Sequence, residues 1–156
     1  MMSAETALEP IHRTITVQCS VEHAFRTFTE GIGTWWPVDS HSIGVMGDGT
    51  GAPAAVVLEP RANGKLGEIA ADGTEKSWGE VLVCEPPHRL VLLWQPAARY
   101  PTEVEVRFTA DGDATRVALE HRKWERYGEE AQEARASYEN GWPGVLACYA
   151  KVADQA

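Results

Sequence analysis

Six short segments between residues 54 and 121 alternate apolar with polar side chains, and each ends at residues typical of tight turns. The alternation is clearest where Val104, Val106 and Phe108 are separated by charged residues. A period of two places one face of a strand in a core and the other in water. Turns such as Asp72-Gly73 favour antiparallel neighbours, because parallel strands need long crossovers. The predicted strands are 54–59, 66–70, 76–84, 89–95, 102–109 and 115–121.

A strand and a short helix are predicted before this region. Residues 11–17 alternate as a half-buried strand, and Ser20 is suited to cap an amphipathic helix that ends at Gly31. A second helical turn ends near Trp36, because the residue before Pro37 disfavours helical geometry. The segment 39–53 is rich in Gly, Ser and Asp and is predicted to be a long loop.

The chain is predicted to end in a helix that packs on the sheet. Its apolar stripe has spacings of three and four residues and consists of Tyr138, Trp142, Val145, Leu146, Tyr149 and Val152. Pro143 leaves two alternatives open: the helix starts near Trp142, or a longer helix is kinked at the proline. The polar stretch 125–136 is expected to be a solvated loop or a short helix. The fold class is therefore α+β.

Length and charge exclude several classes of protein. The 156 residues suit one domain, expected at 11–153 after a flexible tail at 1–10. A net charge of -9 with scattered Lys and Arg argues against nucleic acid as a partner. No apolar run approaches the roughly 20 residues needed to cross a bilayer, and the N-terminus does not resemble a signal peptide. Nucleophile-elbow, phosphate-loop and metal-ligand motifs are not found, so no cofactor and no metal are expected.

The three cysteines are expected to be reduced thiols. Cys19, Cys84 and Cys148 are odd in number, and none has the spacing of a metal or redox motif. Each lies in or beside an apolar stretch, where free cysteine is commonly buried. Reduced thiols indicate a cytoplasmic protein.

Several short motifs, in a fixed order, resemble those of a known superfamily. They are Trp35-Trp36-Pro37, Trp78-Gly79-Glu80-Val81, the segment 85–90, Trp94, Thr102-Glu103-Val104, the segment 113–117, His121 and Gly141-Trp142. The chain resembles the START-like (SRPBCC) helix-grip superfamily, and within it the bacterial homologues of the heat-shock-chaperone ATPase activator. The resemblance spans about residues 11–153. It implies a curved antiparallel sheet of six to seven strands wrapped around the C-terminal helix, with two short helices after the first strand.

Related helix-grip domains bind lipids, hormones or polyketides, and a few catalyse cyclisation, dehydration or hydrolysis. The family name comes from co-chaperones in which this domain is joined to a chaperone-binding domain, and 156 residues leave no room for a second domain. Fold analogy does not choose among these functions.

The inner face of the predicted sheet and the helix stripe supply the candidate ligand-binding residues. An aromatic inner surface can line a cavity for a flat apolar molecule. The alternative is a filled core, since packing explains most of these positions. The candidates are Phe28, Trp36, Leu92, Trp94, Val106, Phe108, Leu119, His121, Trp142, Leu146 and Tyr149.

His121 and Glu80 are the candidates for chemistry. The parity of Val117 and Leu119 points His121 inward, where an imidazole binds a ligand, moves a proton or is simply a hydrogen-bonded core residue. Glu80 shares the parity of Trp78, so the charge argues that both face water, or, if inverted, that Glu80 is a buried general base.

Three more polar residues have weaker claims to a ligand. His41 is in the glycine-rich loop and could reach the mouth of a cavity. Arg61 and Arg89 are turn residues that could bind an anionic group, although solvated arginine is the usual case.

Three functions remain as hypotheses. The leading one is binding, without catalysis, of a small hydrophobic or aromatic molecule in an internal cavity between sheet and C-terminal helix, closed by the 39–53 loop. The second is a cyclase or hydrolase that uses the same cavity through His121, with Glu80 or Tyr138 as partner. The third is a chaperone-associated interaction domain with an acidic surface. A homodimer is a further possibility.

Overall fold

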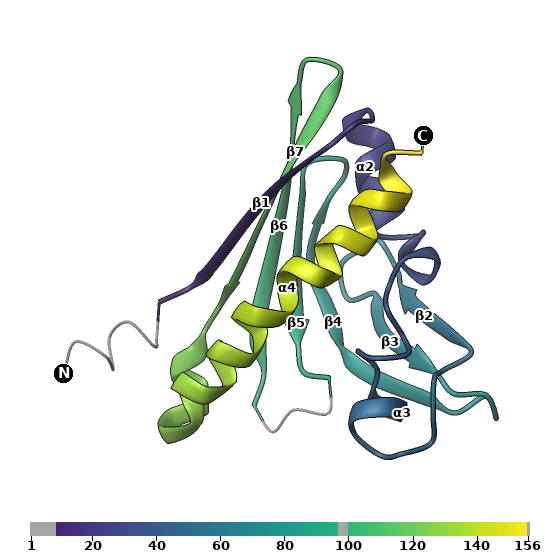
Figure 1. Cartoon of the computed structure of the whole chain (residues 1–156), viewed down its shortest axis with the longest axis vertical. Coiled ribbons are helices and arrows are strands. Elements are labelled where there is room, and N and C mark those ends of the chain that lie inside the picture. The colour runs from purple at the N-terminus through teal and green to yellow at the C-terminus, as the bar shows by residue number, and fades with distance from the viewer. Residues whose placement is uncertain (1–8, 97–99, 156) are drawn as a thin grey trace.

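The computed structural model describes residues 9–96 and 100–155, so most of the predicted tail at 1–10 lies outside the described residues. A seven-stranded antiparallel sheet with the order β1-β7-β6-β5-β4-β3-β2 curls around the C-terminal helix (Figure 1). The α+β class and all six strands predicted between residues 54 and 121 are confirmed. The strands are β1 (Ile11–Val17), β2 (Ala55–Leu58), β3 (Lys65–Ile69), β4 (Glu75–Glu85), β5 (Arg89–Trp94), β6 (Thr102–Asp111) and β7 (Ala114–Arg122).

The helices are α2 (Val21–Phe28), η1 (Ile32–Thr34), α3 (Ile43–Met46), η2 (Trp124–Glu130) and α4 (Ala131–Ala153). Ser20 caps α2 as predicted, because its hydroxyl accepts the backbone N–H of His23 at 3.1 Å. The short turn η1 then carries Trp35 and Trp36 into the core. None of the helices in the described part of the chain is long and apolar enough to cross a membrane.

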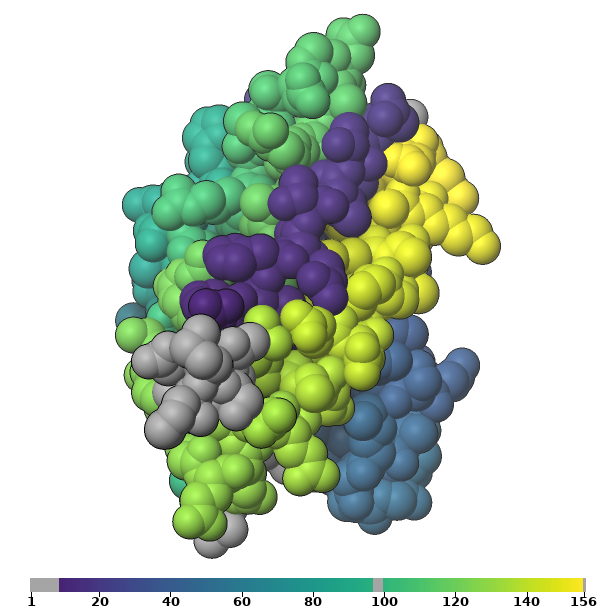
Figure 2. Space-filling model, turned by 60° about the vertical axis from the view of Figure 1, so that its left-hand side comes forward, coloured from purple at the N-terminus to yellow at the C-terminus, as the bar shows by residue number. Residues whose placement is uncertain are grey.

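The C-terminal helix α4 runs through Pro143, which settles the two alternatives in favour of the longer helix. A proline has no backbone N–H, so the carbonyl of Glu139, four residues earlier, loses its helical donor. Arg13 of β1 replaces that donor, with 3.0 Å between its guanidinium and the Glu139 carbonyl oxygen. Figure 2 shows β1 (purple) lying beside α4 (yellow-green to yellow), which brings Arg13 within reach of the helix.

Two bulges in β4 overturn the predicted parity of this strand. Opposite β3, the pairs are Leu66 with Gly79 and Gly67 with Ser77, so Trp78 is an extra residue. Gly79 has a φ of 140°, a conformation that a residue with a Cβ rarely adopts. The expectation that Trp78 and Glu80 share one face is therefore wrong: Trp78 is buried in the core, whereas Glu80 is half-exposed.

The second β4 bulge explains an exposed leucine. Val81 pairs with Leu92 and Val83 pairs with Val91, so Leu82 has no partner in β5. The side chain of Leu82 is consequently turned outward and is 37% exposed.

The 39–53 segment, predicted as a loop, contains the short helix α3. Ser42 caps this helix by accepting the backbone N–H of Val45 at 3.2 Å, and it donates to the carbonyl of Val38 at 2.8 Å. Lys76 of β4 holds the outer side of the segment through an ion pair of 2.6 Å with Asp48. Lys76 also donates to the Thr50 hydroxyl at 2.6 Å, so one side chain of the sheet holds the segment at two points.

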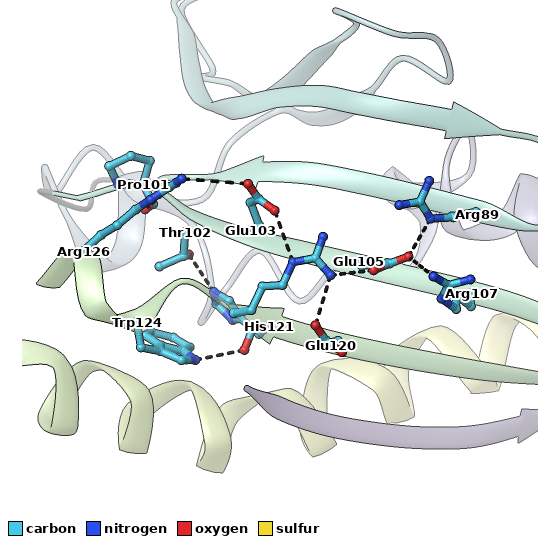
Figure 3. Close-up of polar contacts among 11 residues, drawn as sticks. Arg89, Pro101, Thr102, Glu103, Glu105, Arg107, Glu120, His121, Trp124 and Arg126 are labelled. Atoms are coloured by element: carbon cyan, nitrogen blue, oxygen red, sulfur yellow. Dashed lines mark hydrogen bonds and ion pairs between the residues drawn. The ribbon is translucent and has the colours of Figure 1, made fainter. Parts of the chain in front are cut away.

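The outer face of the sheet carries an ion cluster centred on Glu105 (Figure 3). Glu105 pairs with Arg89 at 2.6 Å, with Arg107 at 2.9 Å and with Arg122 at 2.5 Å. Burial by itself raises the pKa of Glu105, but the hydrogen bonds from Arg122 and Arg89 outweigh it and lower the pKa below its usual value. Arg89 therefore belongs to this ion cluster on the outer face of the sheet. Arg61, the other arginine considered for an anionic group, pairs with Glu59 at 3.1 Å.

Candidate functional site

A pocket of about 320 Å³ lies between α4, the 39–53 segment and the ends of β4 and β5. This volume is at the lower end of the range of small-molecule sites. The residues from α4 face those of the 39–53 segment, which lies next to the helix in Figure 2 (blue). The lining consists of Trp36, His41, Ser42, Ile43, Met46, Gly47, Trp78, Trp94, Pro96, Ser137, Tyr138, Gly141, Trp142 and Val145.

Four of the six tryptophans form the inner wall of the pocket. The ring centroids of Trp36 and Trp78 are 5.0 Å apart, those of Trp36 and Trp94 are 5.8 Å apart, and those of Trp94 and Trp142 are 5.5 Å apart. The planes of neighbouring rings are tilted against one another, an arrangement that is favourable for aromatic pairs. These contacts hold each indole in a defined orientation.

Each of these four indole N–H groups donates to an acceptor of the protein. Trp36 donates to the His41 carbonyl at 2.6 Å, Trp94 to the Tyr138 hydroxyl at 3.3 Å and Trp142 to His121 at 3.0 Å. Trp78 donates to the Glu68 carboxylate at 2.8 Å. Because an indole has a single polar hydrogen, a molecule in the pocket meets the carbon faces and edges of these rings.

Tyr138 lines the pocket, and its hydroxyl bonds to Trp94. Its oxygen accepts the Trp94 N–H, which leaves the hydroxyl proton for another partner. Burial raises the pKa of Tyr138 to about 12, so the group is a neutral phenol near pH 7. The hydroxyl of Tyr138 therefore keeps its proton and can donate it in a hydrogen bond.

The 39–53 segment contributes His41 and Ser42 to the lining. The hydroxyl of Ser42 is already engaged with Val38 and Val45. His41 has Nδ1 2.7 Å from the Ser40 hydroxyl. Among the residues that the structure describes, no three His, Cys, Asp or Glu side chains gather to hold a metal ion.

His121 points inward as predicted, is fully buried and has both ring nitrogens engaged. Trp142 donates to Nδ1 at 3.0 Å, so Nε2 carries the proton and donates to the Thr102 hydroxyl at 2.7 Å (Figure 3). Thr102 in turn donates to the Trp94 carbonyl at 3.3 Å. Of the three alternatives for His121, this arrangement fits a hydrogen-bonded core residue.

The sequence candidates divide between the pocket and the core. Trp36, Trp94 and Trp142 line the pocket. The remaining eight pack in the core around it and are Phe28, Leu92, Val106, Phe108, Leu119, His121, Leu146 and Tyr149. The candidate base Glu80 belongs to β4 and does not line the pocket.

Sequence reasoning missed Trp78 and Glu68. The signal for Trp78 was the following Gly79, which permits the bulge, but the position of a bulge depends on the partner strand. Glu68 shares the parity of the apolar Leu66 on β3, a pattern that places a carboxylate on the inner face. Its side chain is 2% exposed.

The chain matches one protein family over most of its length. The family described as Activator of Hsp90 ATPase homolog 1-like protein matches residues 18–152. No curated protein sequence matches the chain.

Several solved structures are similar to this chain. An anthrahydroquino-gamma-pyrone synthase, Txn09, in complex with SUM, is 33% identical, has a TM-score of 0.61, and the match covers 92% of this chain and 96% of that chain. The self-sacrificing resistance protein CalC from Micromonospora echinospora is 26% identical, with a TM-score of 0.72 and 96% of each chain covered.

A third structure is similar in fold. The Aha1 dimer from Colwellia psychrerythraea is 14% identical, has a TM-score of 0.63, and the match covers 93% of this chain and 96% of that chain. These likenesses bear out the helix-grip architecture expected from the sequence motifs.

Proposed function

This chain belongs to the Activator of Hsp90 ATPase homolog 1-like family, and from that premise we propose that it binds a small, flat, largely aromatic molecule in the tryptophan-lined pocket. The observation that carries the proposal is the hydrogen bonding of the four indole N–H groups. Their N–H groups bond to the protein, so the pocket offers aromatic carbon to whatever enters it. Offset stacking and edge contacts favour a planar aromatic ligand over a branched aliphatic one.

The hydroxyl of Tyr138 adds one directional contact. A phenol or quinone oxygen of such a ligand would accept a hydrogen bond from this hydroxyl. No Asp, Glu, Lys or Arg is among the described lining residues, which favours an uncharged ligand. The two relatives with the higher identities, a synthase of an anthrahydroquino-gamma-pyrone and a resistance protein, agree with a protein that handles a small molecule.

Two glycines of α4 allow a matched test of the pocket. Gly141 lines the pocket, and a Cβ added there would meet the His41 Nε2 atom at 3.9 Å, an ordinary contact. Gly144, three residues on, would place a Cβ where nothing lies within 4 Å. A leucine at either position is favoured over glycine by about 1 kcal/mol in a helix. Only the leucine at position 141 occupies the pocket.

The probe is 1,8-dihydroxyanthraquinone, a planar uncharged tricycle, and its binding is measured by quenching of tryptophan fluorescence. We expect saturable binding to the wild type and to Gly144→Leu, and at least roughly 10-fold weaker binding to Gly141→Leu, the effect of about 1.4 kcal/mol. Equal affinity of Gly141→Leu and Gly144→Leu for the probe would show that it binds elsewhere. A wild type that binds no tricyclic probe would contradict the proposal.

Catalysis on such a molecule is the second candidate function, favoured by the 33% identity with the synthase over 92% of this chain. Tyr138 is the residue placed to give a proton to a ligand oxygen, whereas both nitrogens of His121 are engaged. Incubation with an open-chain anthrahydroquinone precursor, followed by liquid chromatography with mass detection, tests for ring closure, because chromatography separates a cyclised isomer and the mass reveals any loss of water. Tyr138→Phe should lower turnover by roughly 100-fold if the phenol transfers a proton. Unchanged turnover in that variant would remove Tyr138 from the chemistry.

The homodimer and the chaperone partner stay predictions. The dimeric structural neighbour is 14% identical, a level at which the likeness concerns the fold. Sedimentation of the purified chain at several concentrations would test the dimer, and pull-down with an Hsp90-class chaperone would test the partner.

A further inference from the structure

Glu68 is a buried carboxylate that does not line the pocket, yet it contacts two of its walls. Its Oε1 atom accepts the backbone N–H of Ile43 at 2.6 Å and the indole N–H of Trp78 at 2.8 Å. Its Oε2 atom accepts the backbone N–H of Gly44 at 3.1 Å. Ile43 and Trp78 both line the pocket, one from the 39–53 segment and one from the sheet.

From these contacts we infer that Glu68 is a positioning residue that joins the 39–53 segment to Trp78 and so sets the spacing of two pocket walls. The inference rests on the proposed function, because that spacing matters only if the pocket holds a ligand. All three donors to Glu68 are neutral N–H groups, so the carboxylate is engaged by hydrogen bonds alone. Hydrogen bonds that involve a charged group are about twice as strong as neutral ones.

A backbone hydrogen bond closes part of the 39–53 segment into a turn. The Gly51 N–H donates to the Gly44 carbonyl at 2.9 Å. A Cβ on Gly44 would lie 1.9 Å from the Gly51 carbonyl oxygen, so this close approach requires glycine. We therefore expect a displacement at Ile43 and Gly44 to be passed to this turn, which includes the pocket residues Met46 and Gly47.

The segment has a second, outer attachment. Lys76 pairs with Asp48 at 2.6 Å, and the side chains are 13% and 41% exposed, respectively. Glu68 is 2% exposed, so it is the more deeply buried of the two attachments and the one that contacts pocket residues.

An amide in place of the carboxylate distinguishes positioning from simple packing. Glu68→Gln keeps the shape of the side chain but replaces one acceptor oxygen with an NH₂ group, which faces an N–H donor. At least one of the three bonds is then lost. The matched control is Glu105→Gln, which alters another buried carboxylate on the outer face of the sheet, away from the pocket.

Hydrogen exchange of the Ile43 and Gly44 amides, followed by NMR without ligand, is the first measurement. We expect at least one of these two amides to exchange at least roughly 10-fold faster in Glu68→Gln than in the wild type, as the loss of a charge-assisted bond implies, and both to be unchanged in Glu105→Gln. The dissociation constant for 1,8-dihydroxyanthraquinone should rise by a similar factor only in Glu68→Gln. Exchange of both amides within about twofold of the wild type in Glu68→Gln would overturn the inference.

A second pair of variants tests whether the two walls are coupled through Glu68. Trp78→Phe removes one donor to Glu68 and leaves the Ile43 and Gly44 bonds in place. If Glu68 joins the walls, the Ile43 amide should exchange at least roughly threefold faster in this variant. Trp124→Phe is the control, because the Trp124 N–H donates to the His121 carbonyl instead. Unchanged Ile43 exchange in Trp78→Phe would overturn the coupling. This test does not depend on whether Glu68→Gln folds.

The exchange measurements need no ligand, so the two proposals fail separately. If the wild type binds no aromatic probe while Glu68→Gln still frees the Ile43 and Gly44 amides, the proposed function fails and the attachment by Glu68 stands. If the probe binds equally well to the wild type and to Glu68→Gln, and the Ile43 and Gly44 amides exchange at the same rates in both, the proposed pocket stands and the role of Glu68 fails.

Discussion

His121 illustrates how single residues of this chain are controlled by their neighbours. Burial lowers the pKa of His121 to about 3, from an ordinary value of 6.5. The indole of Trp142 can only donate, so Nδ1 of the imidazole has to remain unprotonated to accept it. A proton on Nδ1 would break that bond and leave a charge in the core. The imidazole is therefore neutral in the folded protein, with one bond on each nitrogen.

This arrangement predicts a loss of stability in mild acid. Below pH 6.5 the unfolded chain binds a proton at His121, whereas the folded chain does not until about pH 3. The contribution of His121 to the free energy of unfolding should therefore be fully present above pH 6.5 and be lost as the pH drops toward 3. The slope from one such group is at most about 1.4 kcal/mol per pH unit. Urea unfolding between pH 7 and pH 5, above the range of ordinary carboxylates, measures it.

The controls are two histidine variants. His121→Gln should lose most of this slope, whatever its stability at pH 7. His12→Gln, at a side chain that is 67% exposed, should keep it. An identical slope in the wild type and in His121→Gln would mean that His121 does not carry the pH dependence.

At the scale of elements, α4 depends on a strand far away in the sequence. Pro143 lies inside the helix, and the Glu139 carbonyl that it leaves free accepts Arg13 from β1 at 3.0 Å. The part of α4 before Pro143 supplies Ser137, Tyr138 and Gly141 to the pocket. The edge strand β1 thus supports the helical segment that forms one wall of the site.

A double-mutant cycle tests this support. Arg13→Met should destabilise the wild type by about 1–3 kcal/mol, since it removes a charged donor from a partly buried carbonyl. Pro143→Ala restores a backbone N–H that can bond Glu139, so Arg13→Met should cost at least about 0.5 kcal/mol less in that background. Gly144→Ala is the control, because it improves the helix without giving Glu139 a donor. Equal costs of Arg13→Met in all three backgrounds, measured by urea unfolding, would contradict the account.

At the scale of the whole molecule, one core joins the sheet, α2 and α4. Tyr149 of α4 donates to the Ala24 carbonyl of α2 at 2.8 Å, and its ring contacts Phe28 and Trp35 at 5.2 Å each. The tryptophans of the pocket continue this aromatic cluster through the contact of Trp35 with Trp36 at 5.6 Å. The pocket is an extension of the core, with walls held by the same contacts that stabilise the fold.

This shared core predicts a single cooperative unfolding transition for the expected domain at 11–153. Tryptophan fluorescence reports on the pocket and the core, and far-ultraviolet circular dichroism reports on the sheet and helices. The two urea curves should coincide, with one midpoint and a slope of about 1–3 kcal/mol per molar urea. Separate midpoints would show that the pocket region and the sheet unfold as different units.

The strands, the capped helix α2 and the inward direction of His121 could all be predicted from the amino-acid sequence. Each of these depends on residues a few positions apart: an alternation of two, a spacing of three and four, a turn dipeptide or a Ser cap. Such local patterns can be recognised without knowing any tertiary contact. All six strands between β2 and β7 are therefore where the alternation predicted them.

Which of these residues form the site depends on contacts between segments far apart in the sequence. Trp78 faces the pocket because β3 and β4 pair out of step around it, and alternation within β4 alone cannot reveal a bulge. Pro143 is accommodated inside α4 because Arg13, 126 residues away from Glu139, supplies the missing donor. Glu68 is buried because three N–H groups, two from the 39–53 segment and one from β4, converge on it. These contacts are long-range, and they exist only once the sheet has closed around the helix.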